Sequence, residues 1–297
     1  MQTLYAFFQT QNTSLPNAEK ELMRNLEKTY DLYLHLLLLV GVLTDMEQKR
    51  VESLKYKFLF TEEDRNPNLR FAHNRLAEQL FANETLCRFA EKNGSIWDDT
   101  DRMFLKKLRS DIIDSDFHQE YLRTPDTYEA DRDFWRKIYK WIIAENEQLP
   151  EILEDKQIFW SSDVEIILSF VQKTINRFEE TGDNNQAILP MFDNEADREY
   201  ALLLLRKTIL EYDAHLELIN RYIANWDIER IAAMDLYVMQ LALTEIKHCQ
   251  SIPISVSLNE YIELAKLYST PQSSGFINGI LDRIIADLRA EGKLFKG

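Results

Sequence analysis

The apolar residues of this chain recur in steps of three and four, which is the spacing of one face of an α-helix. The clearest run consists of Leu202, Leu205, Ile209, Tyr212, Leu216, Ile219 and Ile223. Glycine and proline contribute only 7 residues each to the 297 of the chain, too few for strands joined by tight turns. We therefore predict an all-α protein, and the 45% of hydrophobic residues suffices for a substantial core.

Turn-forming residues divide the predicted helices into two regions. Helices are expected over 2–11 and from about Ala18 to Phe60, and several shorter ones between 68 and 180. The most loop-like stretch is 181–186, followed by Pro190, and it forms the best internal boundary. Beyond it we predict four helices: one through 202–223, one capped by Asp227, one opened by the capping-box pattern at Ser257, and one from about Ser273.

The cellular setting predicted from the sequence is the cytoplasm. Cys87 and Cys249 are far apart and have no neighbouring Cys or His cluster, which argues against disulfides and structural zinc. The first residues show no signal-peptide pattern. The longest apolar run, Leu36 to Leu43, is too short to span a bilayer and is typical of a buried helix.

The formal charge of −15 disfavours strong binding of nucleic acid by the chain alone, because phosphate contacts need a basic surface. Residues 191–297 contain 16 acidic and 11 basic side chains, so this segment carries only −5 of the total. The acidity is concentrated in the preceding part of the chain. We expect weak RNA affinity without a partner.

The sequence contains no pattern that indicates catalysis. Glu245 and His248 have the Glu-x-x-His spacing of carboxylate-bridged metal sites, but such sites need two of these pairs. Glu211 and His215 lie one helical turn apart and are expected to be solvated. Glycine-rich phosphate loops and nucleophile motifs are missing as well. We expect no enzyme activity, no metal site and no cofactor.

Asp235 departs from the local pattern, because it falls on the apolar stripe of its predicted helix. A buried carboxylate without a partner is costly. Two interpretations stay open. Asp235 has a structural role, in which it accepts hydrogen bonds from a neighbouring helix terminus or lies at the edge of the stripe, or it receives a basic or hydroxyl group from another protein.

The stretch Gln272-Ser273-Ser274-Gly275-Phe276 is a polar helix start with an aromatic ring in its first turn. Free amides at a helix start suit phosphate, and an exposed ring can stack on an unpaired base. The alternative is an ordinary helix cap with Phe276 turned into the core.

These residues lie within a recognisable signature. The run IPISVSLNEYIELAK at 252–266 and the run FINGILD at 276–282 resemble the paired signature of the NusB family of transcription antitermination factors. MQLALTE at 239–245 and MQTLY at 1–5 are similar to two further helices of that family. The resemblance covers 1–12 as the first helix and 196–297 as a C-terminal helical bundle, and leaves 13–195 as an additional helical region.

The resemblance implies a fold of two packed helical bundles without catalytic activity. It also implies a heterodimer with a small basic ribosomal protein, called NusE in its transcription role. That pair would bind single-stranded boxA-type nascent RNA and so act indirectly on the RNA polymerase elongation complex. By position, Tyr5 and Asp235 correspond to partner-binding places, and Gln272, Ser273, Ser274, Gly275 and Phe276 to the RNA-binding helix start.

One family feature is missing from this sequence, namely an arginine-rich segment before the first helix. We expect the natural reading frame to extend upstream with several Arg or Lys residues. Two other functions remain open. The chain could be a helical scaffold that binds protein but not RNA, or the non-catalytic part of an RNA methyltransferase, which the lack of a glycine-rich cofactor loop disfavours.

Overall fold

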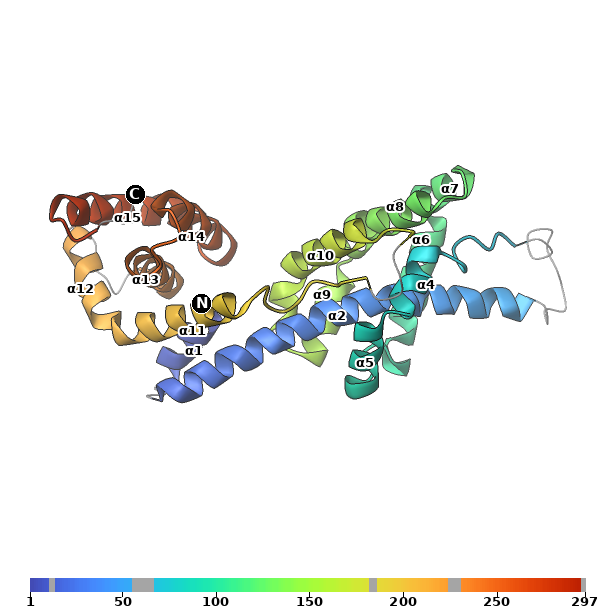
Figure 1. Ribbon diagram of the computed structural model, residues 1–297, viewed down its shortest axis with the longest axis horizontal. Coiled ribbons are helices and arrows are strands. Elements are labelled where there is room, and N and C mark those ends of the chain that lie inside the picture. Colours follow the sequence, from blue (N-terminus) through green and yellow to red (C-terminus); the bar gives the residue numbers. More distant parts are fainter. Residues whose placement is uncertain (11–13, 55–66, 182–185, 224–230, 295–297) are drawn as a thin grey trace. The chain divides into compact units, whose positions relative to one another are not determined.

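The computed structural model describes residues 1–10, 14–54, 67–181, 186–223 and 231–294, and every regular element in these ranges is helical (Figure 1). This confirms the predicted all-α class. The chain divides into two compact units: unit 1 comprises Met1–Asn25 and Phe192–Gly297, and unit 2 comprises Leu26–Met191. Unit 1 extends beyond the N-terminal segment 1–12 expected from the sequence, since Ala18 and Leu22 also pack in its core.

Unit 2 is built on a 40-residue helix, α2 (Leu15–Leu54), of which the part from Leu26 onward belongs to this unit. The end predicted for this helix near Phe60 lies outside the described residues. The other elements of unit 2 are α4 (Arg75–Phe81), α5 (Glu84–Asn93), η1 (Asp99–Asp101), α6 (Arg102–Asp114), α7 (Asp116–Arg123), α8 (Tyr128–Ile138), the π-helical turn η2 (Tyr139–Ile143), α9 (Gln148–Lys156) and α10 (Trp160–Arg177).

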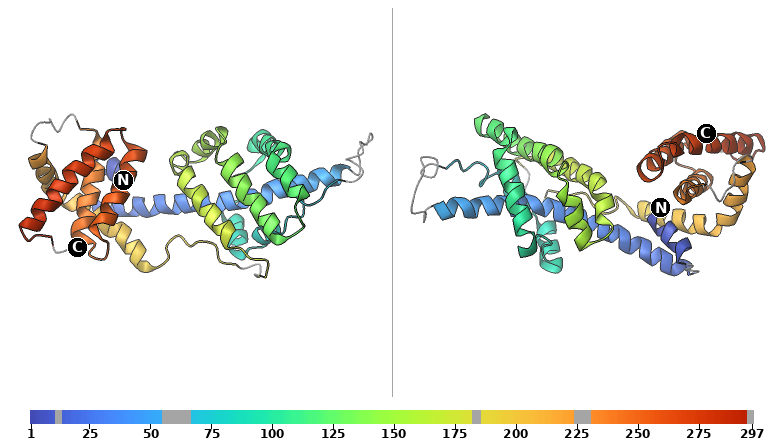
Figure 2. Two further views of the ribbon diagram at one scale, coloured as in Figure 1. Left: turned by 90° about the horizontal axis from the view of Figure 1, so that it is seen from above. Right: turned by 180° about the vertical axis from the view of Figure 1, so that it is seen from behind.

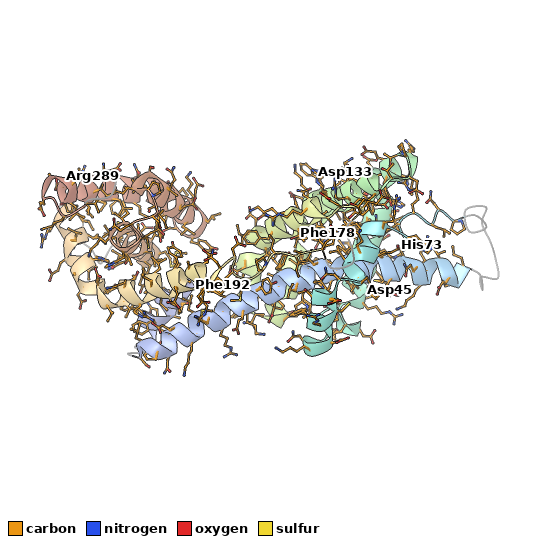
Figure 3. All side chains as sticks on the ribbon, in the orientation of Figure 1. Asp45, His73, Asp133, Phe178, Phe192 and Arg289 are labelled. Atoms are coloured by element: carbon orange, nitrogen blue, oxygen red, sulfur yellow. The ribbon has the colours of Figure 1, made fainter. Side chains whose placement is uncertain are left out.

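Short polar side chains explain where several of these helices begin. Asn74, Asn83, Ser115 and Thr127 each accept a hydrogen bond from a backbone amide in the first turn of the helix that follows. The side chains of the unit then fill the space between the helices, with Phe178 among the largest fully buried ones (Figure 3). The unit therefore has a core of its own.

α2 is long and apolar enough to cross a membrane by length and composition. Its apolar residues Leu36, Leu37, Leu39, Val40 and Leu43 are, however, fully buried against the other helices of unit 2. A membrane span exposes such side chains to lipid instead. The packing is that of a core helix, as predicted for the run 36–43.

Unit 1 is arranged around α13 (Ala233–His248) (Figure 2). Its other helices are α1 (Gln2–Gln9), the first turns of α2, α11 (Glu195–Leu210), α12 (Tyr212–Tyr222), α14 (Ile254–Tyr268) and α15 (Ser273–Ala290). α13 packs against α1, α11, α12, α14 and α15. All residues from Tyr237 to Ile246 are buried, so α13 is covered on every side.

Two local predictions for unit 1 are wrong. The stripe through 202–223 predicted one helix, but the chain forms α11 and α12 with a break at Glu211. The capping-box pattern at Ser257 predicted a helix start, but α14 begins at Ile254, directly after Pro253. Proline fixes its own backbone near the geometry of a helix start, so it outweighs the downstream serine. The predicted cap Asp227 lies outside the described residues.

Candidate functional site

The Asp235 carboxylate lies in the first turn of α13 and is only 6% exposed. It accepts hydrogen bonds from the hydroxyl groups of Ser269 and Ser273, the latter at 2.8 Å. Ser269 is the C-terminal cap of α14 and Ser273 is the first residue of α15. The carboxylate thus has the internal contacts with neighbouring helix termini that were one of the two interpretations of the sequence.

The connection between α14 and α15 is held by further hydrogen bonds of Ser273, which is 2% exposed. Its Oγ accepts from the Thr270 amide at 3.2 Å and lies 2.8 Å from the Thr270 hydroxyl. Its own amide donates to the Thr270 carbonyl at 2.9 Å. The network uses Ser269, Thr270 and Ser273, three of the four hydroxyl residues within 269–274. That density of hydroxyl residues was the sequence signal by which Ser269 could have been found.

The residues predicted to bind RNA differ in exposure. Gln272 and Gly275 are exposed, Ser274 and Phe276 are half-buried, and Ser273 is buried. A Cβ atom added at Gly275 would meet no atom within 4 Å, so this side of the helix start is open. Phe276 packs against the core of unit 1 with part of its surface and leaves the rest accessible. Gln272 is therefore the predicted residue best placed to contact a ligand.

Tyr5, the other predicted partner-binding residue, projects from α1 and is 42% exposed. Its ring meets the edge of Tyr237 of α13, with 5.9 Å between the ring centroids. Phe8, one turn further along α1, packs on Tyr212 with 4.1 Å between the ring centroids. Tyr5 thus packs on the N-terminal half of α13, and Asp235 lies in that same half. Tyr5 is exposed and Asp235 is buried.

A second buried carboxylate, that of Glu245, lies in α13 and accepts hydrogen bonds from the hydroxyl groups of Tyr200 and, at 3.1 Å, Tyr261. Burial, together with the neighbouring Glu245 charge, raises the pKa of both tyrosines above the ordinary range. These tyrosines therefore stay protonated and act as donors. Glu245 makes a hydrogen-bonded contact between helices, which gives no support for the metal interpretation of Glu245 and His248.

Glu211 and His215 do not form the solvated pair expected from the sequence. His215 is 1% exposed, and burial, with the nearby Lys247 charge, lowers its pKa to about 4. Glu211 binds Lys247 and His248, each at 2.5 Å. Burial raises the pKa of Glu211, but its interactions with Lys247 and His248 lower it more. The described residues contain no cluster of His, Cys, Asp and Glu suited to a metal ion.

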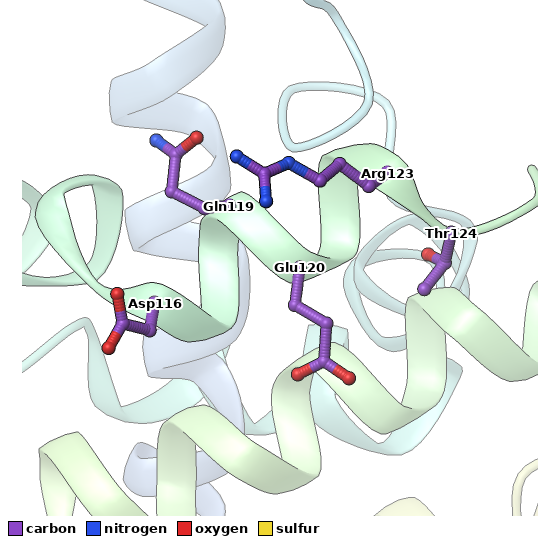
Figure 4. A pocket seen from close by; sticks show the side chains of 5 residues that line it. All are labelled: Asp116, Gln119, Glu120, Arg123 and Thr124. Atoms are coloured by element: carbon purple, nitrogen blue, oxygen red, sulfur yellow. The ribbon is translucent and has the colours of Figure 1, made fainter.

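Unit 2 has a shallow depression of about 380 Å³ along α7 (Figure 4). Gln119 and Arg123 point to one side of this helix and Glu120 to the other, where it pairs with Lys137 at 2.8 Å. None of the residues predicted to bind RNA or protein belongs to it. We assign no function to this depression.

The described residues form an all-helical protein with a polar helix start at the connection between α14 and α15 and an exposed tyrosine on α1. The profile of the NusB family matches residues 163–286, from within α10 to within α15. The transcription antitermination protein NusB of Salinibacter ruber is 39% identical over 132 residues, which cover 42% of this chain and 82% of that protein. The chain belongs to the NusB family.

Other relatives give the same result. NusB of Thermodesulfovibrio yellowstonii is 37% identical over 116 residues, covering 39% of this chain and 72% of that protein. NusB of Alkaliphilus oremlandii is 40% identical over 91 residues, covering 31% and 66%. No solved structure matches the chain. Since the family profile begins at residue 163, most of unit 2 lies outside the part shared with the family.

Proposed function

We propose that this protein is a cytoplasmic transcription antitermination factor that binds NusE, a small basic ribosomal protein, and together with it binds boxA-type nascent RNA. Membership of the NusB family supports the antitermination role. The observation that carries the RNA-binding part is the open helix start of α15, where Gln272 and Gly275 are exposed beside a half-buried Phe276. The proposal includes no catalytic step and no cofactor.

The charge of the chain supports the need for a basic partner. With a net charge of −15, the protein alone repels the phosphate backbone, and a cationic protein bound to unit 1 offsets part of that repulsion. Tyr5 has the exposure that a direct contact with this partner needs. Tyrosine is also a residue type on which interface energies often concentrate.

A two-part binding experiment tests the proposal. The purified chain is titrated with NusE, and the complex is then titrated with boxA-type RNA and with a scrambled RNA of the same length. We expect tight RNA binding only by the complex, and only to boxA. Gln272→Ala should weaken RNA binding about threefold to tenfold, because it removes an exposed hydrogen-bonding amide. The matched control is Asn220→Ala, which removes another exposed amide of unit 1 on α12.

Tyr5→Ala should weaken NusE binding about tenfold, since a half-exposed aromatic anchor is lost. Leu210→Ala is its control, because Leu210 is an exposed apolar residue of the same unit. If NusE binds and neither RNA does, the protein is a protein-binding scaffold instead, a function that the acidic surface would favour. If NusE does not bind, the heterodimer is wrong.

A further inference from the structure

The Asp235 carboxylate connects the two ends of the loop that precedes the proposed RNA-binding helix start. One oxygen, Oδ1, accepts from Ser269, the last cap of α14, and the other, Oδ2, accepts from Ser273 at 2.8 Å. The residues between them are Thr270, Pro271 and Gln272. A single charge thus holds both ends of a three-residue loop.

The direction of the hydrogen bonds makes the carboxylate the point on which the loop depends. A hydroxyl group has one proton, and Ser273 Oγ lies 2.8 Å from Asp235 Oδ2 and 3.1 Å from Ser269 Oγ. The proton goes to the carboxylate, which is the nearer and stronger acceptor. The lone pairs of Ser273 Oγ are then free to accept from the amide of Thr270 at 3.2 Å and from its hydroxyl at 2.8 Å. The carboxylate therefore orients Ser273, and Ser273 fixes Thr270.

Burial also limits what Asp235 can offer to another protein. Both oxygens already accept a hydrogen bond, and 6% of the residue is exposed. Little of the carboxylate is therefore accessible to a donor from a partner protein. Gln272, which follows Pro271 directly, is by contrast exposed and is carried by the loop that Asp235 holds.

We infer that Asp235 is a positioning residue for RNA binding: through Ser269 and Ser273 it sets the conformation of the α14–α15 connection and so the place of Gln272. This inference rests on the proposed function and assigns Asp235 to the RNA site in place of the expected partner contact. Preorganised contacts of this kind raise affinity by reducing the loss of freedom on binding.

The test uses the full chain bound to NusE and compares Asp235→Asn, Ser273→Ala and the double variant with the wild type. Asparagine keeps one acceptor oxygen but presents an NH₂ group where the second serine donates. We expect Asp235→Asn and Ser273→Ala each to weaken boxA binding about tenfold. The double variant should lose no more boxA affinity than the single variant with the larger loss, because both substitutions break the same network. NusE affinity should stay within about twofold of wild type.

Asp213→Asn is the matched control, since Asp213 is an exposed acidic residue in the first turn of α12, as Asp235 is in the first turn of α13. It removes the same charge at an equivalent helix position and should leave RNA binding unchanged. Ser269→Ala and Ser269→Thr provide a second pair at a half-buried position. The threonine variant retains the hydroxyl and should retain RNA binding, whereas the alanine variant should lose it.

Unchanged boxA binding by Asp235→Asn, or additive losses in the double variant, would overturn the inference. A parallel loss of NusE affinity would overturn it too, because it would show that Asp235 contacts the partner. If the wild-type complex itself fails to bind boxA RNA, the proposed function is wrong and the inference is lost with it. If the wild-type complex binds boxA RNA and the Asp235 and Ser273 variants bind it equally well, only the positioning role is wrong.

Discussion

The two units bury their carboxylates in different ways. In unit 2, the buried acids Glu47, Asp101 and Asp131 each pair with at least one Arg or Lys of the same unit, at 2.6 to 2.8 Å. In unit 1, the buried acids Asp235 and Glu245 accept hydrogen bonds from serine and tyrosine hydroxyl groups. Among the residues that the structure describes, neither of these two pairs with a cation.

The two units therefore stabilise buried carboxylates by different means, namely a neighbouring cation in unit 2 and hydroxyl hydrogen bonds in unit 1. A cation offsets the charge of a buried carboxylate, whereas a hydroxyl satisfies its lone pairs and leaves the charge in place. In unit 2 the charge of each of these buried carboxylates is therefore offset by a neighbouring cation. In unit 1 the two carboxylates of α13 instead depend on hydroxyl donors from α11, from α14 and its C-terminal cap, and from the start of α15.

The strongest test of this comparison is the stability cost of removing one acid from each unit. Asp131→Ala should destabilise unit 2 by about 3 kcal/mol, because it removes the buried carboxylate that pairs with Arg75 and one acceptor of the Tyr121 hydroxyl. Arg75 keeps only its pairs with the exposed carboxylates of Asp126 and Glu180. Asp235→Ala should cost unit 1 only about 1 to 2 kcal/mol, since its partners are neutral hydroxyls. Hydrogen-exchange mass spectrometry measures each unit separately. Equal losses would remove the distinction.

Acid should weaken both units, because each contains buried histidine whose pKa is lowered by burial: His215 in unit 1, and His35 and His118 in unit 2. Burial, the largest cause, lowers the pKa of His35 in unit 2 and of His215 in unit 1 to about 4. In the unfolded chain each histidine has its ordinary pKa of about 6.5, so it binds a proton at a higher pH than the buried histidine of the folded protein does. This contribution to stability is therefore complete above pH 6.5 and is lost as the pH falls toward 4, by about 2 kcal/mol per histidine at pH 5.

The variant His215→Gln makes the pH test specific to unit 1. Hydrogen exchange at pH 7 and pH 5 should show a smaller decrease of stability in unit 1 of the variant than in unit 1 of the wild type. Unit 2, which retains His35, serves as the internal control. An undiminished pH dependence in unit 1 would show that carboxylates, and not His215, determine its response to acid.

The smallest expected effect concerns two buried hydroxyl groups. Ser257 in α14 is fully buried, and its Oγ has no hydrogen-bond partner among the residues that the structure describes. Ser257→Ala should leave unit 1 equally stable or stabilise it by up to about 1 kcal/mol. Thr174 in unit 2 contacts the Tyr33 hydroxyl at 2.6 Å, so Thr174→Val should cost about 1 kcal/mol. Thermal unfolding of the two variants checks the opposite signs.

The sequence was a good guide to the helices and a poor one to their interruptions. Apolar spacing correctly predicted the all-α class, and the polar stretch correctly predicted the start of α15 at Ser273. It could not show the break at Glu211, because the residues on either side continue the same stripe. Apolar spacing shows which face of a helix is covered. A break between two helices does not alter the spacing when the apolar residues of both helices follow the same steps of three and four.

The site residues show the same limit. The position of Asp235 on an apolar stripe indicated that it needs a partner, but Ser269 and Ser273 lie 34 and 38 residues away and are brought to it by the packing of α14 and α15 on α13. His215 looked solvated because its burial depends on α13, whose Lys247 contacts it at 3.2 Å. One-dimensional spacing cannot show which helix covers a residue.

The division of unit 1 between the two ends of the chain has a consequence for protein synthesis. Leu4 of α1 is fully buried in a core that also needs α13, which the ribosome makes more than 200 residues later. Unit 2 is contiguous, so it can fold during translation while α1 waits without its neighbours. Closing such a long loop adds only a modest entropic cost. The delay instead exposes the apolar side of α1 to chaperones and to other nascent chains until release.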